Sequence, residues 1–525
     1  MIKSIEICFD GYIQNINFKY FENRIHLPEM NFSDSFSLKF KFKYPILRLR
    51  NHDYTWVKPN KSYLASELCP KILQLSNGLY IQANTVKGAW TISPDNTTLH
   101  WLFNQPYQYP YTQYENSNNQ KITKHHKYTI NLSILKLLAT KHPLEFSRSK
   151  IGFTPVVCFT DHCDFDTRDN LKTIRTFFKK YHIKTTKGIF LNQFSKRETN
   201  ASYETDRCEL KSWEQDGHEL AYHSLTQSIR EKTKALKEFE NFTPLQNAKT
   251  WIDHGYQPYN FTLSQKNKTI EAFMKTARTK KISFFWTYID NASAQKGILN
   301  QLDANSFSLN QLLKATQHFG FVHRWSLRIK GVLFYYYESK KAVLVYKMIA
   351  SSYKSFKQRM NVKNLFLFLK QIVRLSSLVI TPLLSLKYKN KIFPLSMYKP
   401  IVFPFINNTF LFQTVEINDF KNGLSNSNQN QLLKDKGFVI LHTYFSVKLN
   451  YHKGRLLIDD HTVNPAVEHN FKILSHHIKS SKLWNPTLTE LIEYMRPLFN
   501  SELTLDASNK VVFKEKNYLL TRYIK

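Results

Sequence analysis

The sequence has few of the residues that interrupt regular structure or cross-link small domains. Among 525 residues there are only 13 Gly and 18 Pro, which predicts long regular elements. The five cysteines are sparse, odd in number and not paired at any motif spacing. This argues against a disulfide framework and favours a reducing compartment, the bacterial or eukaryotic cytosol. With 42% hydrophobic and 15% aromatic residues, the chain can bury a large core and is not expected to be disordered.

Several segments that would define a class of protein are also missing. The start alternates apolar and polar residues and lacks the continuous apolar core of a secretory signal. No stretch offers about twenty uncharged apolar residues, so we expect no membrane-spanning helix. The sequence contains neither a Gly-x-x-x-x-Gly-Lys loop nor a Gly-x-Ser-x-Gly elbow. A P-loop nucleotide site and an elbow-type serine hydrolase are therefore disfavoured.

Acidic residues are scarce relative to basic ones. The chain has 40 Asp and Glu against 74 Lys and Arg, for a formal net charge of +34. Such a charge attracts polyanions, which include nucleic acid, anionic lipid and acidic glycans. A compositionally biased genome would also raise lysine usage, so the charge alone does not choose among these partners.

The length predicts two or three domains, and the texture of the sequence changes near residue 145. Residues 1–145 favour a β-rich domain: residues 35–44 alternate with period two, and residues 88–103 have the pattern of a hairpin. This domain could bind glycans as an accessory module or be purely structural. The polar stretch 108–128 is the best candidate for a linker or long loop.

Residues 146–525 alternate between short apolar strands and amphipathic helices. This alternation is typical of βαβ units that build a parallel sheet or barrel. In such folds the chemistry lies at the carboxyl ends of the strands. We therefore expect a (β/α) barrel, with an insertion at about 300–400.

Part of that insertion is unusually basic. Residues 321–400 contain sixteen Lys and Arg against one acid, Glu338. Within them a predicted helix places a row of apolar side chains on one face and three bases on the other. The apolar residues are Leu365, Phe368, Leu369, Ile372 and Val379, and the bases are Lys363, Lys370 and Arg374. Such a helix fits contact with an anionic membrane, ordinary core packing or, less well, nucleic-acid binding.

Polar residues gather at four predicted strand ends. These are "VVCFTDHCDFDT" (156–167), "GHELAYHSLTQS" (217–228), "TWIDHGYQPYN" (250–260) and "GFVILHTYFS" (437–446). A zinc-like ion needs about three His or Asp ligands, a nearby carboxylate can take a proton from water, and a His can protonate a leaving group. Cys163 is disfavoured as a nucleophile because its carboxylate neighbours would raise the pKa of the thiol.

Together these four motifs resemble the polysaccharide deacetylase family, metal-dependent carbohydrate esterases with a NodB-type homology domain. The resemblance covers about 150–265 and 400–495. It implies an irregular (β/α) barrel of the polysaccharide deacetylase type, preceded here by the β-rich N-terminal domain. It also implies one divalent metal ion, with zinc the expected metal. The family's paired Asp, its Gly-His-Glu strand running into His-Ser, and its closing Leu-His match residues 161–166, 217–224 and 441–442.

The resemblance implies a role for each site residue. Asp164 would be the base and His442 the acid, while Asp166, His223 and His254 would hold the metal. The sequence departs from the family pattern where Gln227 replaces a metal-binding histidine and where Asp253-His254 stands in place of an Arg. The register of the three acids is ambiguous between Asp164 and Asp166. Supporting or substrate-binding residues would be Asp161, His162, His218, Gln227, Asp253, Pro258 and Tyr259.

The expected activity is hydrolytic removal of an N-acyl group, most plausibly acetyl, from an amino sugar. The substrate would be a polysaccharide or a lipid-linked, nascent surface glycan at the inner face of the membrane, reached by a cytoplasmic or peripheral protein. One alternative is a degenerate glycan-binding or scaffold protein of the same fold. Another is a glycoside hydrolase with paired Asp, which would need two carboxylates about 5–9 Å apart. Nucleic-acid binding is the least favoured, and the oligomeric state stays open.

Overall fold

Two antiparallel sheets from the first 140 residues pack face to face in this computed structural model, which describes residues 1–59, 64–115, 120–197, 199–337, 340–384, 389–447 and 453–524. In sheet order, the first sheet holds β2 (Tyr12–Asn15), β1 (Ile2–Phe9), β6 (Phe36–Phe42), β13 (Thr98–Phe103), β12 (Ala89–Ile92) and β9 (Leu64–Ala65). The second holds β3 (Lys19–Phe21), β4 (Arg24–His26), β17 (Lys136–Thr140), β11 (Tyr80–Ala83), β10 (Ile72–Leu75), β7 (Ile46–Arg50) and β8 (Trp56–Val57). The period-two pattern predicted strand β6 correctly, because its alternate residues are buried between the sheets.

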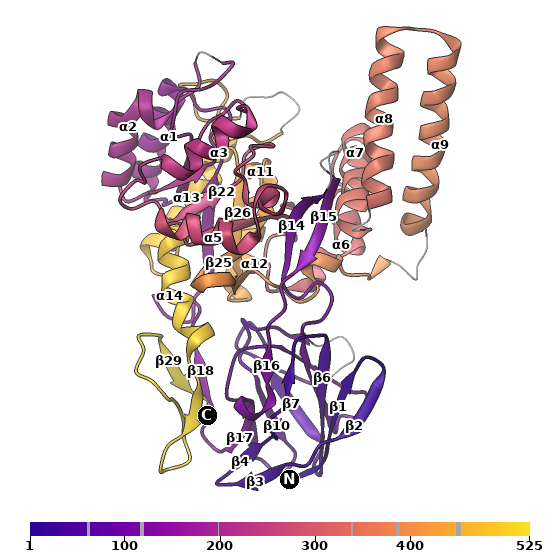
Figure 1. The fold of residues 1–525 in the computed structure, drawn as a ribbon, viewed down its shortest axis with the longest axis vertical. Coiled ribbons are helices and arrows are strands. Elements are labelled where there is room, and N and C mark those ends of the chain that lie inside the picture. The colour runs from indigo at the N-terminus through magenta and orange to yellow at the C-terminus, as the bar shows by residue number, and fades with distance from the viewer. Residues whose placement is uncertain are drawn as a thin grey trace.

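The stretch expected to be a linker is a β-hairpin instead. Its strands β14 (Pro110–Glu115) and β15 (Gln120–His125) pair in antiparallel register and lie against the second body of the protein (Figure 1). The Gln113 side chain donates a hydrogen bond to the Phe261 carbonyl at 3.0 Å, and the Tyr114 ring lies edge-on to Tyr288. The polar, low-complexity composition did not indicate these strands, because they are stabilised by tyrosines that pack against the barrel.

Seven parallel strands close into a barrel. Their order around it is β19, β20, β21, β22, β23, β25 and β26, and β26 pairs again with β19. A short strand, β24 (Val402–Pro404), adds antiparallel to β25. The bounds of the barrel strands are β19 (Val156–Asp161), β20 (Thr186–Ile189), β21 (Glu219–His223), β22 (Thr250–Ile252), β23 (Phe284–Ser293), β25 (Phe410–Glu416) and β26 (Phe438–Thr443). The predicted α/β barrel after a β-rich region is thus present.

Amphipathic helices cover the barrel, and one helix closes its lower end. The covering helices include α1 (Arg168–Tyr181), α2 (Tyr203–Gln215), α3 (Lys232–Asn241), α5 (Ile270–Thr279), α12 (Asn426–Lys434) and α13 (Pro465–Lys479). The apolar residues of α14 (Leu488–Asn500) join the core cluster formed by the inward-facing residues of the barrel strands. The end opposite α14, where the strands finish, is left for polar residues.

The insertion lies between β23 and β24 and is helical. It contains α6 (Leu309–Ala315), α7 (Phe321–Gly331), a π-helical turn η4 (Val332–Tyr336), α8 (Lys340–Gln358) and α9 (Val362–Leu384). Figure 1 shows α8 and α9 as a helical hairpin that stands out from the rest of the molecule. By length and composition alone, α9 could cross a membrane, which the sequence analysis did not expect.

The chain's last strands return to its first half. Strand β29 (Thr521–Tyr523) pairs with β18 (Leu144–Phe146), and the β27 (Leu503–Leu505) and β28 (Val511–Phe513) hairpin lies beside the sandwich. Arg24 donates a hydrogen bond to the Leu505 carbonyl at 3.0 Å. The C-terminal strands therefore connect the barrel domain with the N-terminal sandwich.

The position of α14 predicts a large stability effect from one substitution. Leu491 is fully buried, so Leu491→Ala should lower the free energy of unfolding by about 2–5 kcal/mol through lost burial and a residual cavity. Leu520, which is 41% exposed, provides the control: Leu520→Ala should change the free energy of unfolding by less than about 0.5 kcal/mol. Urea titration of both variants makes the comparison, and equal values would mean that α14 does not seal the barrel.

Candidate functional site

The carboxyl ends of the barrel strands bring together side chains that are far apart in the sequence. Asp161 ends β19, His223 ends β21, His254 follows β22 and His442 lies near the end of β26. Parallel strands in a closed barrel finish on the same rim, so these residues share one mouth. Gly188 on β20 leaves room there: an added Cβ would lie 2.6 Å from the Asp161 carbonyl oxygen and 3.3 Å from the Cβ of His223.

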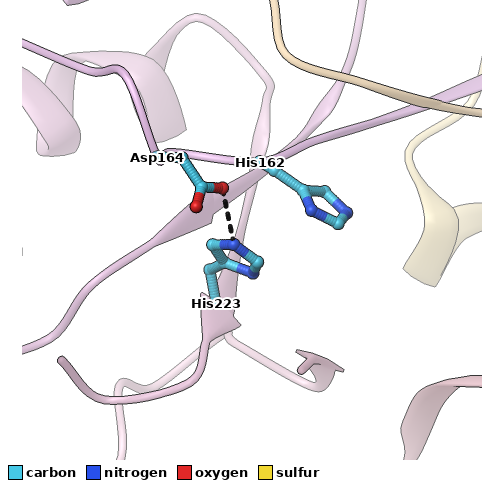
Figure 2. Close-up of side chains that lie close together, drawn as sticks. All are labelled: His162, Asp164 and His223. Atoms are coloured by element: carbon cyan, nitrogen blue, oxygen red, sulfur yellow. Dashed lines mark hydrogen bonds and ion pairs between the residues drawn. The ribbon is translucent and has the colours of Figure 1, made fainter. Parts of the chain in front are cut away.

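Asp164, His223 and His254 form the centre of this mouth. Asp164 Oδ2 lies 2.9 Å from His223 Nε2, and Asp164 Oδ1 lies 3.0 Å from His254 Nδ1. The two imidazole nitrogens lie 3.2 Å apart. Figure 2 shows Asp164 and His223 directed at one another, with His162 beside them. The structure therefore brings His254, which the sequence analysis proposed as a substitute ligand, into contact with both partners.

Two backbone carbonyls decide which nitrogen of each histidine faces the centre. His223 Nδ1 lies 3.3 Å from the Ile252 carbonyl oxygen, and His254 Nε2 lies 2.9 Å from the Gln227 carbonyl oxygen. A carbonyl oxygen can only accept a hydrogen bond, so each of these nitrogens must carry a proton. In the neutral rings, His223 Nε2 and His254 Nδ1 then present lone pairs toward the Asp164 carboxylate.

This donor set fits a divalent metal ion. Three acceptor atoms that face one another repel unless a cation or a shared proton lies between them. Two ligands of a tetrahedral zinc ion, each about 2.0–2.1 Å from it, lie about 3.3 Å apart, and the three separations here are 2.9, 3.0 and 3.2 Å. Histidines that donate their second N–H to a carbonyl are typical metal ligands. His162 offers a further ligand atom within 4.8 Å of those of Asp164 and His223.

Positive charge at the centre, from a proton or from an ion, keeps Asp164 ionised. Burial favours the neutral form of Asp164, but protons on the inward-facing nitrogens of His223 and His254 would hold its pKa well below its usual range through charge and hydrogen bonding, the part that a metal ion plays beside neutral rings. Burial lowers the pKa of His223 despite the opposing charge of Asp164. An ionised carboxylate beside a neutral imidazole is the state in which both groups can ligate a metal.

The other two acids of the opening motif serve a different partner. Asp161 and Asp166 both contact the ammonium of Lys187 on β20, at 2.6 Å and 2.5 Å, and all three side chains are buried. Asp161 also accepts a hydrogen bond from the Phe445 amide, and Asp166 accepts one from the Ser446 hydroxyl. The prediction that Asp166 contacts the histidines is therefore wrong. Asp164 takes that place, because Lys187 holds its neighbours on either side.

His442 is paired with an acid that the sequence analysis missed. Its Nδ1 lies 3.1 Å from both carboxylate oxygens of Asp290 on β23. The register of β23 against β25 shifts between Trp286 and Asp290, and Tyr288 in this stretch has φ +60°. Bulges next to active sites commonly re-aim side chains. The pairing was not visible in the sequence, although the position of Asp290 directly after the apolar run 282–289 was a signal.

The contact between His442 and Asp290 uses one of the two nitrogens of the His442 imidazole. His442 Nε2 is buried and has no hydrogen-bond partner among the residues that the structure describes. Its ring stacks on His162, with centroids 4.0 Å apart, and packs against Trp286. Burial alone would lower the pKa of His442, but the carboxylate of Asp290 outweighs burial and raises it. The pKa of His162 is far below its usual value because of burial and the neighbouring histidines.

Other residues predicted at the site lie elsewhere. His218 is at the opposite end of β21, where its ring packs on Trp213 and its Nδ1 accepts a hydrogen bond from the Thr185 amide. The Gln227 side chain accepts hydrogen bonds from Ser195 and Ser228, so only its backbone carbonyl touches the site. Both roles predicted for these side chains are corrected by their actual partners.

The loop after β22 uses its polar residues for structure. Asp253 accepts hydrogen bonds from Trp251, the Phe261 amide and Thr262, which occupy both of its oxygens. The carbonyl of Pro258 accepts one from Asn267. The ring of Tyr259 is buried against Phe239 and Trp251. Asp253, Pro258 and Tyr259 therefore hold the loop that carries His254, rather than facing a substrate. Burial raises the pKa of the Cys163 thiol well above its usual value, as expected of an inert cysteine.

A pocket of about 450 Å³ reaches the barrel at Glu416, the residue next to His442 on the neighbouring strand. Glu416, whose Cα pairs with His442 between β25 and β26, lines the barrel side of it. Burial and the neighbouring Asp290 raise the pKa of Glu416. The outer wall comes from the insertion and a later loop, with His323, Lys330, Phe334, Tyr335 and Lys453. The basic insertion thus forms part of a cavity beside the candidate catalytic residues.

Comparisons with known proteins identify no family for this chain. No protein-family model matches it, and no curated protein matches it. A solved GH31 dextranase from Flavobacterium johnsoniae, complexed with glucose, is similar at a TM-score of 0.27 and 8% identity, over 100% of this chain and 73% of that one. A mutant of that dextranase, complexed with isomaltotriose, is similar at a TM-score of 0.26 and 8% identity, over 96% of this chain and 66% of that one. Likenesses this distant carry no argument about fold or function.

The buried Lys187 cluster predicts a pH-dependent loss of stability. Lys187→Met should lower the free energy of unfolding by about 3–5 kcal/mol near pH 7, because two carboxylates lose their buried cation. The matched control is Lys184→Met, since Lys184 makes an exposed pair with Glu490, which contributes about 1 kcal/mol or less.

The sign of the pH effect follows from Asp161. Burial raises the pKa of Asp161 to about 6 even though Lys187 opposes it, and loss of Lys187 raises it further. The folded variant then binds a proton more tightly than the unfolded chain does. The difference in free energy of unfolding between the unsubstituted protein and Lys187→Met should therefore shrink as the pH falls from about 7 toward 5. Denaturant titrations at several pH values measure this, and a deficit that grows on acidification would contradict it.

Proposed function

We propose that this protein is a metal-dependent hydrolase that removes an N-acyl group, acetyl in the simplest case, from an amino sugar of a polysaccharide or lipid-linked glycan. One observation carries the proposal: Asp164, His223 and His254 direct three acceptor atoms at one point on the barrel rim, close to a histidine–carboxylate pair. The four motifs that resemble polysaccharide deacetylases contribute Asp164, His223, His254 and His442, and the closed parallel barrel supports the same assignment.

Asp164, His223 and His254 would hold the ion, with zinc the expected metal and His162 available as a further ligand. When bound, such an ion supplies a Lewis acid that polarises the acyl carbonyl and makes an attacking water more acidic. The carbonyls of Ile252 and Gln227 fix the two rings so that their lone pairs already face inward. Little reorganisation is then needed when the site is loaded.

We propose a different general base from the one expected from the sequence. Both oxygens of Asp164 face the two histidines, so Asp164 is not free to act as the base that the sequence analysis expected. Among the described residues His442 Nε2 has no hydrogen-bond partner, and Asp290 fixes its other nitrogen. We assign both proton transfers to His442: its neutral Nε2 takes the proton of the attacking water, and the imidazolium then donates it to the leaving nitrogen. Asp290 stabilises that imidazolium.

A glycoside hydrolase is the second candidate, and one observation favours it. Glu416 lines the pocket, and burial and the neighbouring Asp290 raise the pKa of its carboxyl group. Two neighbouring carboxyl groups, one of them with a raised pKa, are an arrangement that glycosidases use. Asp290 is already engaged with His442 and Thr414, which is why deacylation ranks first.

The choice of ligands predicts how metal binding responds to substitution. The chain should bind one zinc ion, and Asp164→Asn or His223→Ala should abolish stoichiometric binding because each removes a ligand atom. Asp166→Asn is the matched control, since it changes the neighbouring acid but keeps the hydrogen bond with Ser446. Elemental analysis after zinc loading and dialysis measures this. Metal lost from Asp166→Asn and retained in Asp164→Asn would overturn the assignment.

The His442–Asp290 pair predicts a characteristic pH profile. His442→Ala should lower the rate of acetate release from N-acetylglucosamine oligomers by about 10²–10⁴-fold. Asp290→Asn removes the charge that raises the pKa of His442, so the acidic limb of kcat/KM should move to lower pH. An unchanged limb would exclude His442 as the base. Release of reducing ends without acetate would instead select the glycoside hydrolase.

A further inference from the structure

The helical hairpin α8–α9 carries an apolar surface that no described part of the chain covers. Six side chains of α9 lie at spacings of three, four and seven residues, which places them in one narrow row along the helix. We call this row the α9 stripe. Its members and their exposures are Val362 (83%), Phe366 (67%), Leu369 (50%), Val373 (70%), Ile380 (46%) and Leu384 (75%).

The stripe is distinct from the face that holds the hairpin together. Phe368 stacks on Phe356 and contacts Tyr353 of α8, while Val379 is buried in the main core. Two of the residues grouped in the sequence analysis, Leu365 and Leu369, are 39% and 50% exposed. Apolar residues therefore cover two faces of α9, and within the described residues only one of these faces is used in packing.

Charge determines which partner fits the stripe. Lys363, Lys370 and Arg374 are exposed and follow stripe residues by one position, so they line one edge of it. The sequence from 339 to 400 contains thirteen Lys and Arg and no Asp or Glu. An apolar row with a purely cationic border complements a surface that is apolar beneath and anionic above. A bilayer of anionic lipid has this arrangement.

We propose that the α9 stripe docks the protein on anionic membranes, with α9 lying in the interface. A spanning orientation is disfavoured because Lys370 and Arg374 lie near the middle of α9 and would be placed at the bilayer centre. Lying flat, the same bases reach the headgroups while the stripe enters the acyl boundary. The hairpin follows η4, whose Phe334 and Tyr335 line the pocket beside the His442 pair.

This placement brings the pocket close to the lipid surface. If the proposed function is correct, the substrate class is then a lipid-linked amino-sugar glycan presented from the membrane rather than a free polymer. That step rests on the proposed function, whereas docking itself does not. Membrane binding should be unaffected by removal of the metal or of His442, so failure of the two proposals can be told apart.

The apolar contribution is tested by co-sedimentation of the full chain with vesicles. With phosphatidylcholine–phosphatidylglycerol vesicles, Phe366→Ser combined with Val373→Ser should weaken binding by roughly a hundredfold through lost apolar burial. The matched control is Tyr12→Ser with Ile13→Ser, which removes apolar side chains of similar exposure from β2. Equal binding by the two double variants would overturn the proposal.

The electrostatic contribution has its own pair of variants. Changing Lys363, Lys370 and Arg374 to Gln should weaken binding by about a hundredfold and remove most of its salt dependence. Changing Lys3, Lys19 and Lys41, exposed residues of the sandwich, to Gln lowers the net charge equally and should have little effect. Binding to pure phosphatidylcholine equal to that on anionic vesicles would contradict the electrostatic part. Concentration-dependent dimerisation that the stripe variant abolishes, without lipid binding, would show that a second copy covers the stripe.

Discussion

Two backbone carbonyl groups, those of Ile252 and Gln227, impose the constraint on which the site depends. Each carbonyl accepts a hydrogen bond from the N–H of one histidine, so the other nitrogen of that ring faces Asp164. Both carbonyls belong to strand ends or loops that the closed barrel holds in place. The main chain thus orients both rings, and the Gln227 side chain instead accepts hydrogen bonds from Ser195 and Ser228.

A second constraint separates the three acids of the opening motif. Lys187 is buried on the neighbouring strand and takes Asp161 and Asp166 as partners. A buried cation needs such pairing, since an uncompensated charge in this position is strongly unfavourable. Asp164, the acid between them in the sequence, is left to face the histidines. Asp161 and Asp166 therefore serve the stability of the rim, and His254 from the next strand joins His223 beside Asp164.

Much of the architecture could be predicted from the sequence, because hydrophobic periodicity reports burial directly. The strand with Phe36 to Phe42 and the helix with Leu171 and Phe178 follow their periods closely. The predictions fail where contacts with distant parts of the chain determine the local structure. The tyrosine-rich segment near Tyr114 forms a hairpin because the barrel offers a surface to cover.

The candidate site was predictable as a set of strand ends but not as a set of contacts. Histidines 223, 254 and 442 follow apolar strands, and this signal was sufficient to group them. The choice between Asp164 and Asp166 depends on Lys187, a single charge inside a buried strand. The Asp290 partner depends on an irregularity in β23 that re-aims one side chain. Neither effect has a local sequence period.

The most direct test of the account is the position and coordination of bound zinc. Anomalous diffraction at the zinc edge, on crystals of the zinc-loaded chain, should show one ion between Asp164, His223 and His254, with nitrogen and oxygen ligands at about 2.0–2.1 Å. An ion bound elsewhere, or no ordered ion on this rim at stoichiometric zinc, would contradict the central claim that these three side chains form a metal centre.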